Sequence, residues 1–225
     1  VCVNLIVLAY FKYAAFGVEI LNDFTHTPFS VPDIILPLGI SFFTFQQIAF
    51  LYDVYRREFE IKSFRQYALA VTFFPHLIAG PIVMARKLVP QFVVDEPKSF
   101  FHDMTFMGLC LFVMGLFKKV VIADNMAMYA NPLFARVENG ITLSFMDAWV
   151  AALSYSFQLY FDFSGYSDMA LGLGFMFGIV LSVNFYAPYK ATNIASFWNR
   201  WHISMSNYFR DVVFIPLGGS RRSEE

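Results

Sequence analysis

Charged residues are scarce in this sequence, and the usual motifs of soluble enzymes are missing from it. Only 15% of the 225 residues are charged, whereas a soluble globular domain carries roughly 25%, so the composition argues against a water-soluble core. The net charge of −1 leaves no basic field that could hold nucleic acid. There is no GxGxxG, P-loop, GxSxG, HExxH or CxxC pattern, which excludes the recognisable nucleotide, serine-hydrolase and metal sites.

Cysteine is rare too, and the start of the chain carries no targeting pattern. The two cysteines, Cys2 and Cys110, stand in apolar runs, so we expect buried free thiols and no disulfide framework. The chain begins at Val1 without the basic region and small-residue cleavage site of a signal peptide. It stops on SRRSEE directly after a glycine turn, and we therefore expect a fragment that is incomplete at both ends.

Apolar and aromatic side chains are abundant instead. Of all residues, 58% are hydrophobic and 20% are aromatic, and the mean hydropathy is +0.54. This composition predicts an all-α polytopic membrane protein. No repeat, low-complexity stretch or flexible linker interrupts residues 1–225, so we expect a single transmembrane domain.

Apolar segments close to the roughly 20 residues of a spanning helix alternate with more polar loops. The apolar segments are Val1–Leu21, Ile34–Tyr52, Met104–Ala123, Phe145–Phe163 and Tyr166–Val183. The loop Asp53–Gln66 is rich in Lys and Arg, and the positive-inside rule places it in the cytoplasm. The more polar Asp124–Thr142 is also expected to be a loop.

The apolar segment Tyr67–Met84 (the broken segment) is interrupted by Pro75 and by the pair Gly80 and Pro81. Because basic loops flank it on both sides, we expect a re-entrant segment rather than a complete span. Irregular backbone at membrane depth must be buried in protein or line a wet cavity. Residues Phe73–Val83 are therefore a candidate cavity wall, and simple kinks are the alternative.

The stretch Phe197–Gly219 gathers ionisable side chains after the apolar segments, where such groups are costly and need a reason to be present. Its histidine, His202, suits a general base that deprotonates a hydroxyl, because the reference pKa of histidine is about 6.5. A histidine that only hydrogen-bonds its neighbours is the alternative. Residues Ile194–Phe209, capped by Asn193, are expected to form one amphipathic helix.

Four motifs in this order resemble the membrane-bound O-acyltransferase family, and most closely its bacterial alginate O-acetyltransferase type. The motifs are LPLGISFFTFQ (Leu36–Gln46), FFPHLIAGPI (Phe73–Ile82), YFDFSGYSDMALGLG (Tyr160–Gly174) and FWNRWHISMSNYFRDVVFIPLGG (Phe197–Gly219). The resemblance covers nearly the whole chain.

The resemblance implies a multi-helix fold with a tunnel through the membrane and a location in the bacterial cytoplasmic (inner) membrane. It implies an acyl donor on the cytoplasmic side, such as acetyl-CoA or another acyl thioester, and no tightly bound cofactor or metal. The acceptor would be a hydroxyl of an exported or cell-surface polysaccharide such as alginate. Membrane lipid and periplasmic or extracellular proteins would be the partners.

The resemblance also implies site residues. The family has two histidines, of which one belongs to the RWHIS motif and is His202 here. The other, usually taken as the catalytic one, stands in a Gly-Leu-Trp-His-Gly type motif that does not occur in these 225 residues. His202 is thus our catalytic candidate, in a supporting or positioning role. The expected active-site wall comprises Trp198, Asn199, Arg200, Trp201, Ser204, Pro75, Gly80 and Pro81.

His76 stands where the family more often has glutamine, and a buried structural histidine is the alternative to a functional one. Two other functions stay open. The chain could be a D-alanyl, peptidoglycan or lipid O-acyltransferase of the same family, since nothing in the sequence identifies the acceptor. It could also be a non-enzymatic transporter or channel, although inverted repeats or paired broken helices, which such proteins show, are absent from the sequence.

Overall fold

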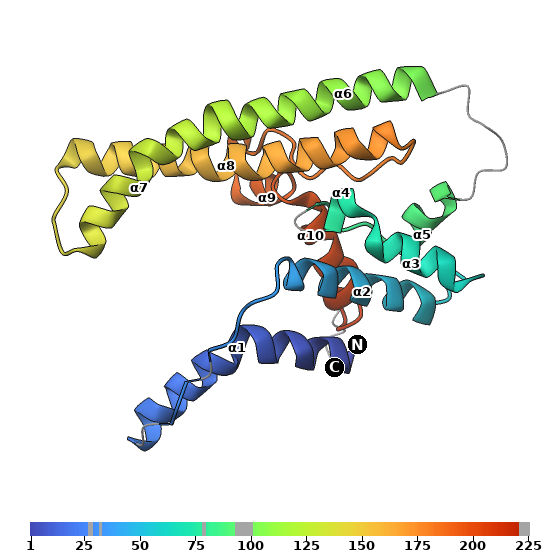
Figure 1. Ribbon diagram of the computed structural model, residues 1–225, viewed down its shortest axis with the longest axis horizontal. Helices are drawn as coiled ribbons and strands as arrows, with labels where there is room; N and C mark the ends of the chain where they lie inside the picture. The colour runs from blue at the N-terminus through green and yellow to red at the C-terminus, as the bar shows by residue number, and fades with distance from the viewer. Residues whose placement is uncertain (27–28, 32, 78–79, 93–100, 221–225) are drawn as a thin grey trace. The chain divides into compact units, whose positions relative to one another are not determined.

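The computed structural model describes residues 1–26, 29–31, 33–77, 80–92 and 101–220 (Figure 1). Within these residues the regular structure is helical and no strand occurs, which confirms the predicted all-α class. The chain forms two compact units. The first comprises Val1–Phe92 with Tyr208–Glu225, and the second comprises Val93–Asn207.

The first unit is built from one long helix and several short ones. They are α1 (Cys2–Thr25), α2 (Ile40–Tyr55), α3 (Phe64–Thr72), α4 (Phe74–Leu77), α5 (Ala85–Leu88), a 3-10 helix (Val89–Phe92) and a π-helix (Phe209–Phe214). The long apolar segment expected at the start of the chain is confirmed as α1. The second apolar segment, expected at Ile34–Tyr52, becomes helical only at Ile40, because Gly39 adopts a left-handed φ of 72° and α2 begins after it.

The broken segment is interrupted as its sequence predicts. Helix α3 ends at Thr72, and Phe73 is extended with a ψ of 99°. Pro75 lies in the first turn of the four-residue helix α4, where its missing amide hydrogen removes no helix hydrogen bond. The chain then runs without helix from Gly80 to Met84 before α5 begins. Its side chains here are buried, so the irregular backbone lies inside protein, as expected of such a segment.

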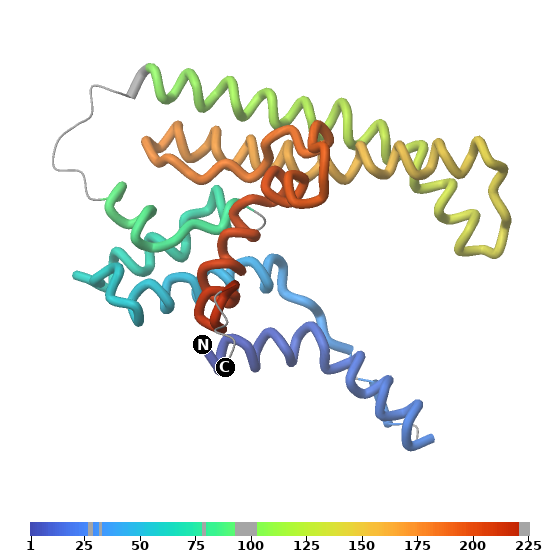
Figure 2. Tube along the Cα trace, turned by 180° about the vertical axis from the view of Figure 1, so that it is seen from behind, coloured from blue at the N-terminus to red at the C-terminus, as the bar shows by residue number. Residues whose placement is uncertain are grey.

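The second unit contains two long packed helices and a set of short ones. They are α6 (Phe101–Phe117), a π-helix (Lys118–Ala123), α7 (Asp124–Glu138), α8 (Phe145–Met176), a 3-10 helix (Pro188–Lys190), α9 (Ile194–Trp198) and most of α10 (Ile203–Tyr208). Figures 1 and 2 show α6 and α8 side by side.

Small residues bring α6 and α8 into close contact. A Cβ atom added to Gly108 would lie 2.5 Å from the carbonyl oxygen of Gly172, and one added to Gly115 would lie 2.5 Å from that of Gly165. Glycines spaced in this way let helix backbones approach, as they do in membrane bundles. These four positions therefore fix how the two helices pack.

Two expectations about the second unit are wrong. The expected loop Asp124–Thr142 is mostly the helix α7, because its Ala, Met, Leu and Arg residues favour a helix and Pro132 removes only one donor. The expected segment Phe145–Phe163 and most of the expected segment Tyr166–Val183 form one helix, α8, which ends at Met176. Ser164 and Gly165 do not break it, since they lie at a close helix contact rather than in a turn.

Apolar side chains cover much of the exposed surface of both units. Among the described residues, two helical stretches are long and apolar enough to cross a membrane, Cys2–Thr25 and Asp103–Glu138. Only 6% and 17% of the residues in the most apolar part of each stretch are buried. Cys2 and Cys110 lie on these stretches and are free, as expected. The expectation that they are buried is wrong, because these helices point apolar side chains outward, as suits contact with lipid.

Candidate active site

The stretch predicted as one amphipathic helix, Ile194–Phe209, is instead divided by a turn around His202. Asn193 caps α9 as predicted, accepting a hydrogen bond of 2.7 Å from the amide of Ser196. Helix α9 ends at Trp198, and residues 199–202 (the His202 turn) lead into α10. His202 has a φ of 45°, in the left-handed region, which only a few per cent of residues with a Cβ atom adopt, histidine more often than most. Such outliers concentrate at functional sites.

Hydrogen bonds from the extended stretch after α8 hold the His202 turn. The carbonyl oxygen of Asn184 accepts from the amide of Ile203 (2.9 Å), and its side-chain Oδ1 accepts from the amide (3.1 Å) and hydroxyl (2.8 Å) of Ser204. The amide of Tyr186 donates to the carbonyl oxygen of Arg200 (2.9 Å). Sequence reasoning missed Asn184, because nothing near it in the sequence marks a partner for a distant turn.

Aromatic rings surround the turn. The ring of His202 meets that of Phe163 edge-to-face, with centroids 4.7 Å apart. Trp201 stacks on Phe197 at 5.7 Å and meets Phe185 edge-to-face at 5.1 Å. Burial among these rings lowers the pKa of His202 to about 4. The imidazole is therefore neutral near pH 7, and one of its nitrogens is a hydrogen-bond acceptor.

The other predicted residues of this stretch differ in exposure. Trp198 and Asn199 are exposed, while Ser204 is buried and bonded to Asn184. The guanidinium of Arg200 is half-buried, lies over the ring of Tyr186 at 5.4 Å and donates to a serine hydroxyl. The turn thus combines a neutral imidazole, a partly accessible cation and an aromatic wall.

Pro75, Gly80 and Pro81 belong to the first unit, where Gly80 packs against Pro75 and His76. A Cβ atom added to Gly80 would lie 2.3 Å from the Cα of His76. His76 is 2% exposed, and its carbonyl oxygen accepts a bond of 2.9 Å from the side chain of Gln46. Whether these residues line a cavity stays a prediction.

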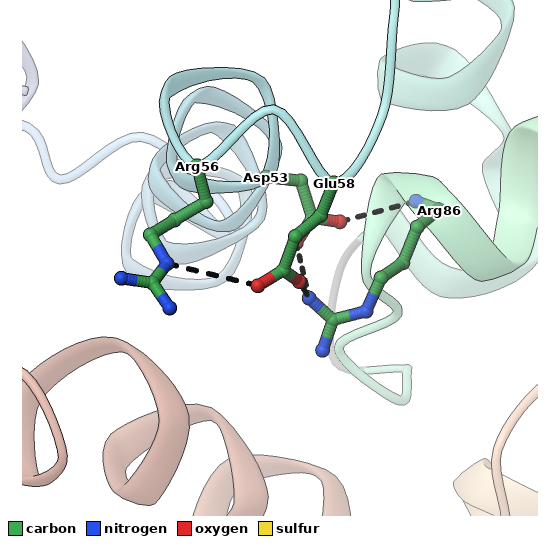
Figure 3. A network of polar contacts seen from close by, with 4 residues as sticks. All are labelled: Asp53, Arg56, Glu58 and Arg86. Atoms are coloured by element: carbon green, nitrogen blue, oxygen red, sulfur yellow. Dashed lines mark hydrogen bonds and ion pairs between the residues drawn. The ribbon is translucent and has the colours of Figure 1, made fainter.

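Ionic contacts fasten the broken segment to α2 (Figure 3). Asp53, at the end of α2, is fully buried and accepts from the amide (3.1 Å) and the guanidinium (2.8 Å) of Arg86 in α5. Glu58 contacts the same guanidinium and also pairs with Arg56. The Asp53–Arg86 pair therefore connects the loop expected in the cytoplasm with the end of the broken segment.

A second set of ion pairs connects the π-helix Lys118–Ala123 with α7 and α8. Lys118 pairs with Asp168 at 2.5 Å, and Lys119 pairs with Asp162 at 2.5 Å and with Asp124 at 2.8 Å. Charges that enter an apolar helix are normally paired in this way. In the described part of the chain, no cluster of three or more His, Cys, Asp or Glu residues is arranged to hold a metal ion.

Comparison with known proteins places these features in a family. Residues 54–225 match the model of MBOAT, the membrane-bound O-acyltransferase family. The chain is 47% identical to the "Probable alginate O-acetylase AlgI" of Pseudomonas aeruginosa, over 99% of this chain and 42% of that protein. It is 44% identical to the peptidoglycan O-acetyltransferase of Helicobacter pylori, over 98% of this chain and 46% of that protein.

A more distant relative has a different acyl group in its name. The teichoic acid D-alanyltransferase of Bacillus subtilis is 33% identical over 79% of this chain and 45% of that protein. The chain therefore spans less than half the length of each of these relatives. The motif Leu36–Gln46 lies before the matched family region, and the other three motifs lie within it.

Proposed function

Since the chain belongs to the membrane-bound O-acyltransferase family, we propose that its protein transfers acetyl groups to hydroxyls of an exported or cell-surface polysaccharide, as an alginate O-acetylase does. The observation that carries this proposal is the His202 turn, which holds a neutral imidazole in a rare backbone conformation. The similarity to the alginate O-acetylases, along almost the entire chain, supports the choice of acceptor class.

The reaction needs an acyl donor that is activated and an acceptor that is deprotonated. A thioester such as acetyl-CoA supplies the acyl group: its C–S bond breaks, a C–O bond forms, and the hydroxyl proton ends on the thiolate that leaves. A base for this proton and donors for the oxyanion are the groups that protein must supply. No tightly bound cofactor takes part.

In this proposal His202 contacts the acceptor hydroxyl. A base whose pKa is about 4 is too weak to hold a proton near pH 7. Its neutral ring accepts a hydrogen bond from the hydroxyl and orients the oxygen toward the acyl carbon, which fits a supporting role beside a stronger base. Arg200, Trp201 and Asn199 stand near His202 in the sequence and are the candidate donors for the negative charge that develops on the oxyanion.

The location and the partners belong to the same proposal. The protein would span the bacterial cytoplasmic membrane several times, with Asp53–Gln66 on the cytoplasmic side, where the donor is made. The polysaccharide lies on the other side, and periplasmic or extracellular proteins would present it. The two long apolar stretches and the exposed apolar surface support a membrane location.

A related acceptor is the second candidate. The peptidoglycan O-acetyltransferase matches this chain almost as well as the alginate O-acetylase does, at 44% against 47% identity. That difference is too small to separate two acceptors. The proposal therefore rests more firmly on O-acetyl transfer than on alginate.

The test is acetyl transfer by the protein expressed from its complete coding sequence in membranes. Labelled acetyl-CoA and either alginate or peptidoglycan would be supplied, and labelled ester counted. His202→Ala should lower transfer by about 10²-fold, as expected when a reacting group is no longer oriented, while the protein remains inserted. His26→Asn, which changes an exposed histidine and keeps a residue that tolerates a left-handed φ, is the control. Undiminished transfer by His202→Ala would refute the role of His202.

A further inference from the structure

Asn184 connects the extended stretch after α8 to the residues that follow His202. It is 1% exposed. Its Oδ1 accepts two hydrogen bonds from Ser204, its carbonyl oxygen accepts one from Ile203, and its Nδ2 donates to the hydroxyl of Ser167 in α8 at 3.4 Å. One buried side chain thus joins α8 to the start of α10.

The same stretch also holds the other side of the His202 turn. The amide of Tyr186 donates to the carbonyl oxygen of Arg200, two residues before His202. The backbone is thereby fixed on both sides of a residue whose φ is 45°. A left-handed histidine is unfavourable by itself, so the surrounding bonds must impose it. Of these bonds, the two that Oδ1 accepts can be removed by changing a side chain.

We propose that Asn184 is the positioning residue that holds His202 in its left-handed conformation for acyl transfer, a role that rests on the proposed function. An amide suits this position because it accepts and donates while uncharged, whereas a buried carboxylate would carry a charge. The Oδ1 bonds set where α10 begins. By fixing the start of α10, these bonds also fix the position of the imidazole against Phe163 and the direction in which the imidazole points.

The first experiment measures the position of His202 without relying on activity. The purified full-length protein is treated with diethyl pyrocarbonate, which modifies accessible neutral imidazoles, and each histidine is quantified by mass spectrometry. Asn184→Ala should speed modification of His202 several-fold relative to His26, which is exposed in the same molecule. The buried His76 of the first unit should stay slow. An unchanged rate at His202 would overturn the proposal.

The second experiment separates positioning from mere stability. In Asn184→Ala, kcat per folded molecule should fall by about 10–100-fold, as expected when a reacting group is displaced by about 1 Å. The KM for the acyl donor should change little. Asn184→Asp keeps the acceptor for Ser204, but it loses the donor to Ser167 and buries a charge, so kcat should recover only in part. A folded Asn184→Ala with normal kcat would refute the positioning role.

A milder pair of variants covers the case in which Asn184→Ala does not fold. Ser204→Ala removes the bond from the Ser204 hydroxyl to Asn184 but keeps the bond from the Ser204 amide. Its kcat should therefore fall less than that of Asn184→Ala, and its His202 should be modified faster than in the native protein. Ser154→Ala removes another buried serine, in α8, and serves as the matched control. Equal behaviour of the two variants would overturn the proposal.

The two proposals can fail separately. If His202→Ala transfers acetyl groups normally, the proposed function of His202 fails, yet the modification rates still decide whether Asn184 holds the turn. If His202→Ala is inactive and Asn184→Ala leaves the modification rate of His202 unchanged, the positioning role alone fails.

Discussion

The broken segment and the His202 turn both interrupt helices near a histidine, but different residues cause the two interruptions. In the broken segment the cause is local: Pro75 lacks an amide hydrogen, and Gly80 packs against the backbone of His76. The His202 turn contains neither proline nor glycine. Its bonds come from Asn184 and Tyr186, which lie in a distant stretch. A helix break that proline or glycine causes can be recognised in the sequence. A break that hydrogen bonds from a distant segment cause cannot.

The largest effect should come from the ionic anchor of the broken segment. Asp53→Ala removes the buried acceptor of Arg86, and removing one partner of a buried pair typically costs about 3–5 kcal/mol. Because Arg86 is partly exposed and also contacts Glu58, we expect about 3 kcal/mol. Unfolding of the detergent-solubilised protein by denaturant measures this loss.

The control for this variant is Glu60→Ala, which changes an exposed carboxylate of the same loop. Surface changes of this kind usually stay within about 0.5 kcal/mol. If Asp53→Ala and Glu60→Ala were equally stable, the broken segment would not depend on its contact with α2, and its position would follow from Pro75 and Gly80 alone.

The sequence predicted most elements whose signal is local. Composition identified the helical membrane class, proline and glycine located the interruptions of the broken segment, and Asn193 marked the start of α9. The sequence-based predictions were wrong where contacts between distant residues determine the structure. The residues between the expected segments Phe145–Phe163 and Tyr166–Val183 lie inside α8, where Gly165 packs against Gly115. The helical spacing of apolar residues at 194–209 gives no sign of the turn. The position of His202 in a motif could be found, but its left-handed backbone could not.

The next largest effect tests whether glycine packing or proline alone maintains the broken segment. Gly80→Ala places a Cβ 2.3 Å from the Cα of His76, and backbone must move to admit it. Overpacking of this kind costs about 1–3 kcal/mol. Gly17→Ala in α1 is the matched control, because nothing lies within 4 Å of the added atom. Thermal unfolding of both variants gives the comparison, and equal melting temperatures would show that Pro75 suffices.

The smallest effect concerns the His202 turn and depends on pH. The pKa of His202 in the folded protein is about 4, below the value of about 6.5 in an unfolded chain. The unfolded chain therefore binds a proton that the folded protein does not bind between these values. His202 therefore does not lower the free energy of unfolding above pH 6.5. It lowers this free energy as the pH drops from 6.5 toward 4, and its effect becomes constant below pH 4.

A variant that cannot titrate isolates this contribution. His202→Gln keeps a polar side chain of similar reach, so its stability should decline less than that of the native protein between pH 6.5 and 4. We expect a difference of about 1–2 kcal/mol, less than the full shift would give because the ring is only partly buried. Parallel denaturation curves for the two proteins over this range would mean that the turn does not keep His202 from water. The imposed left-handed backbone would then fix the direction of the ring without burying it, and the proposed contact with an acceptor hydroxyl would need a more basic imidazole than the one described.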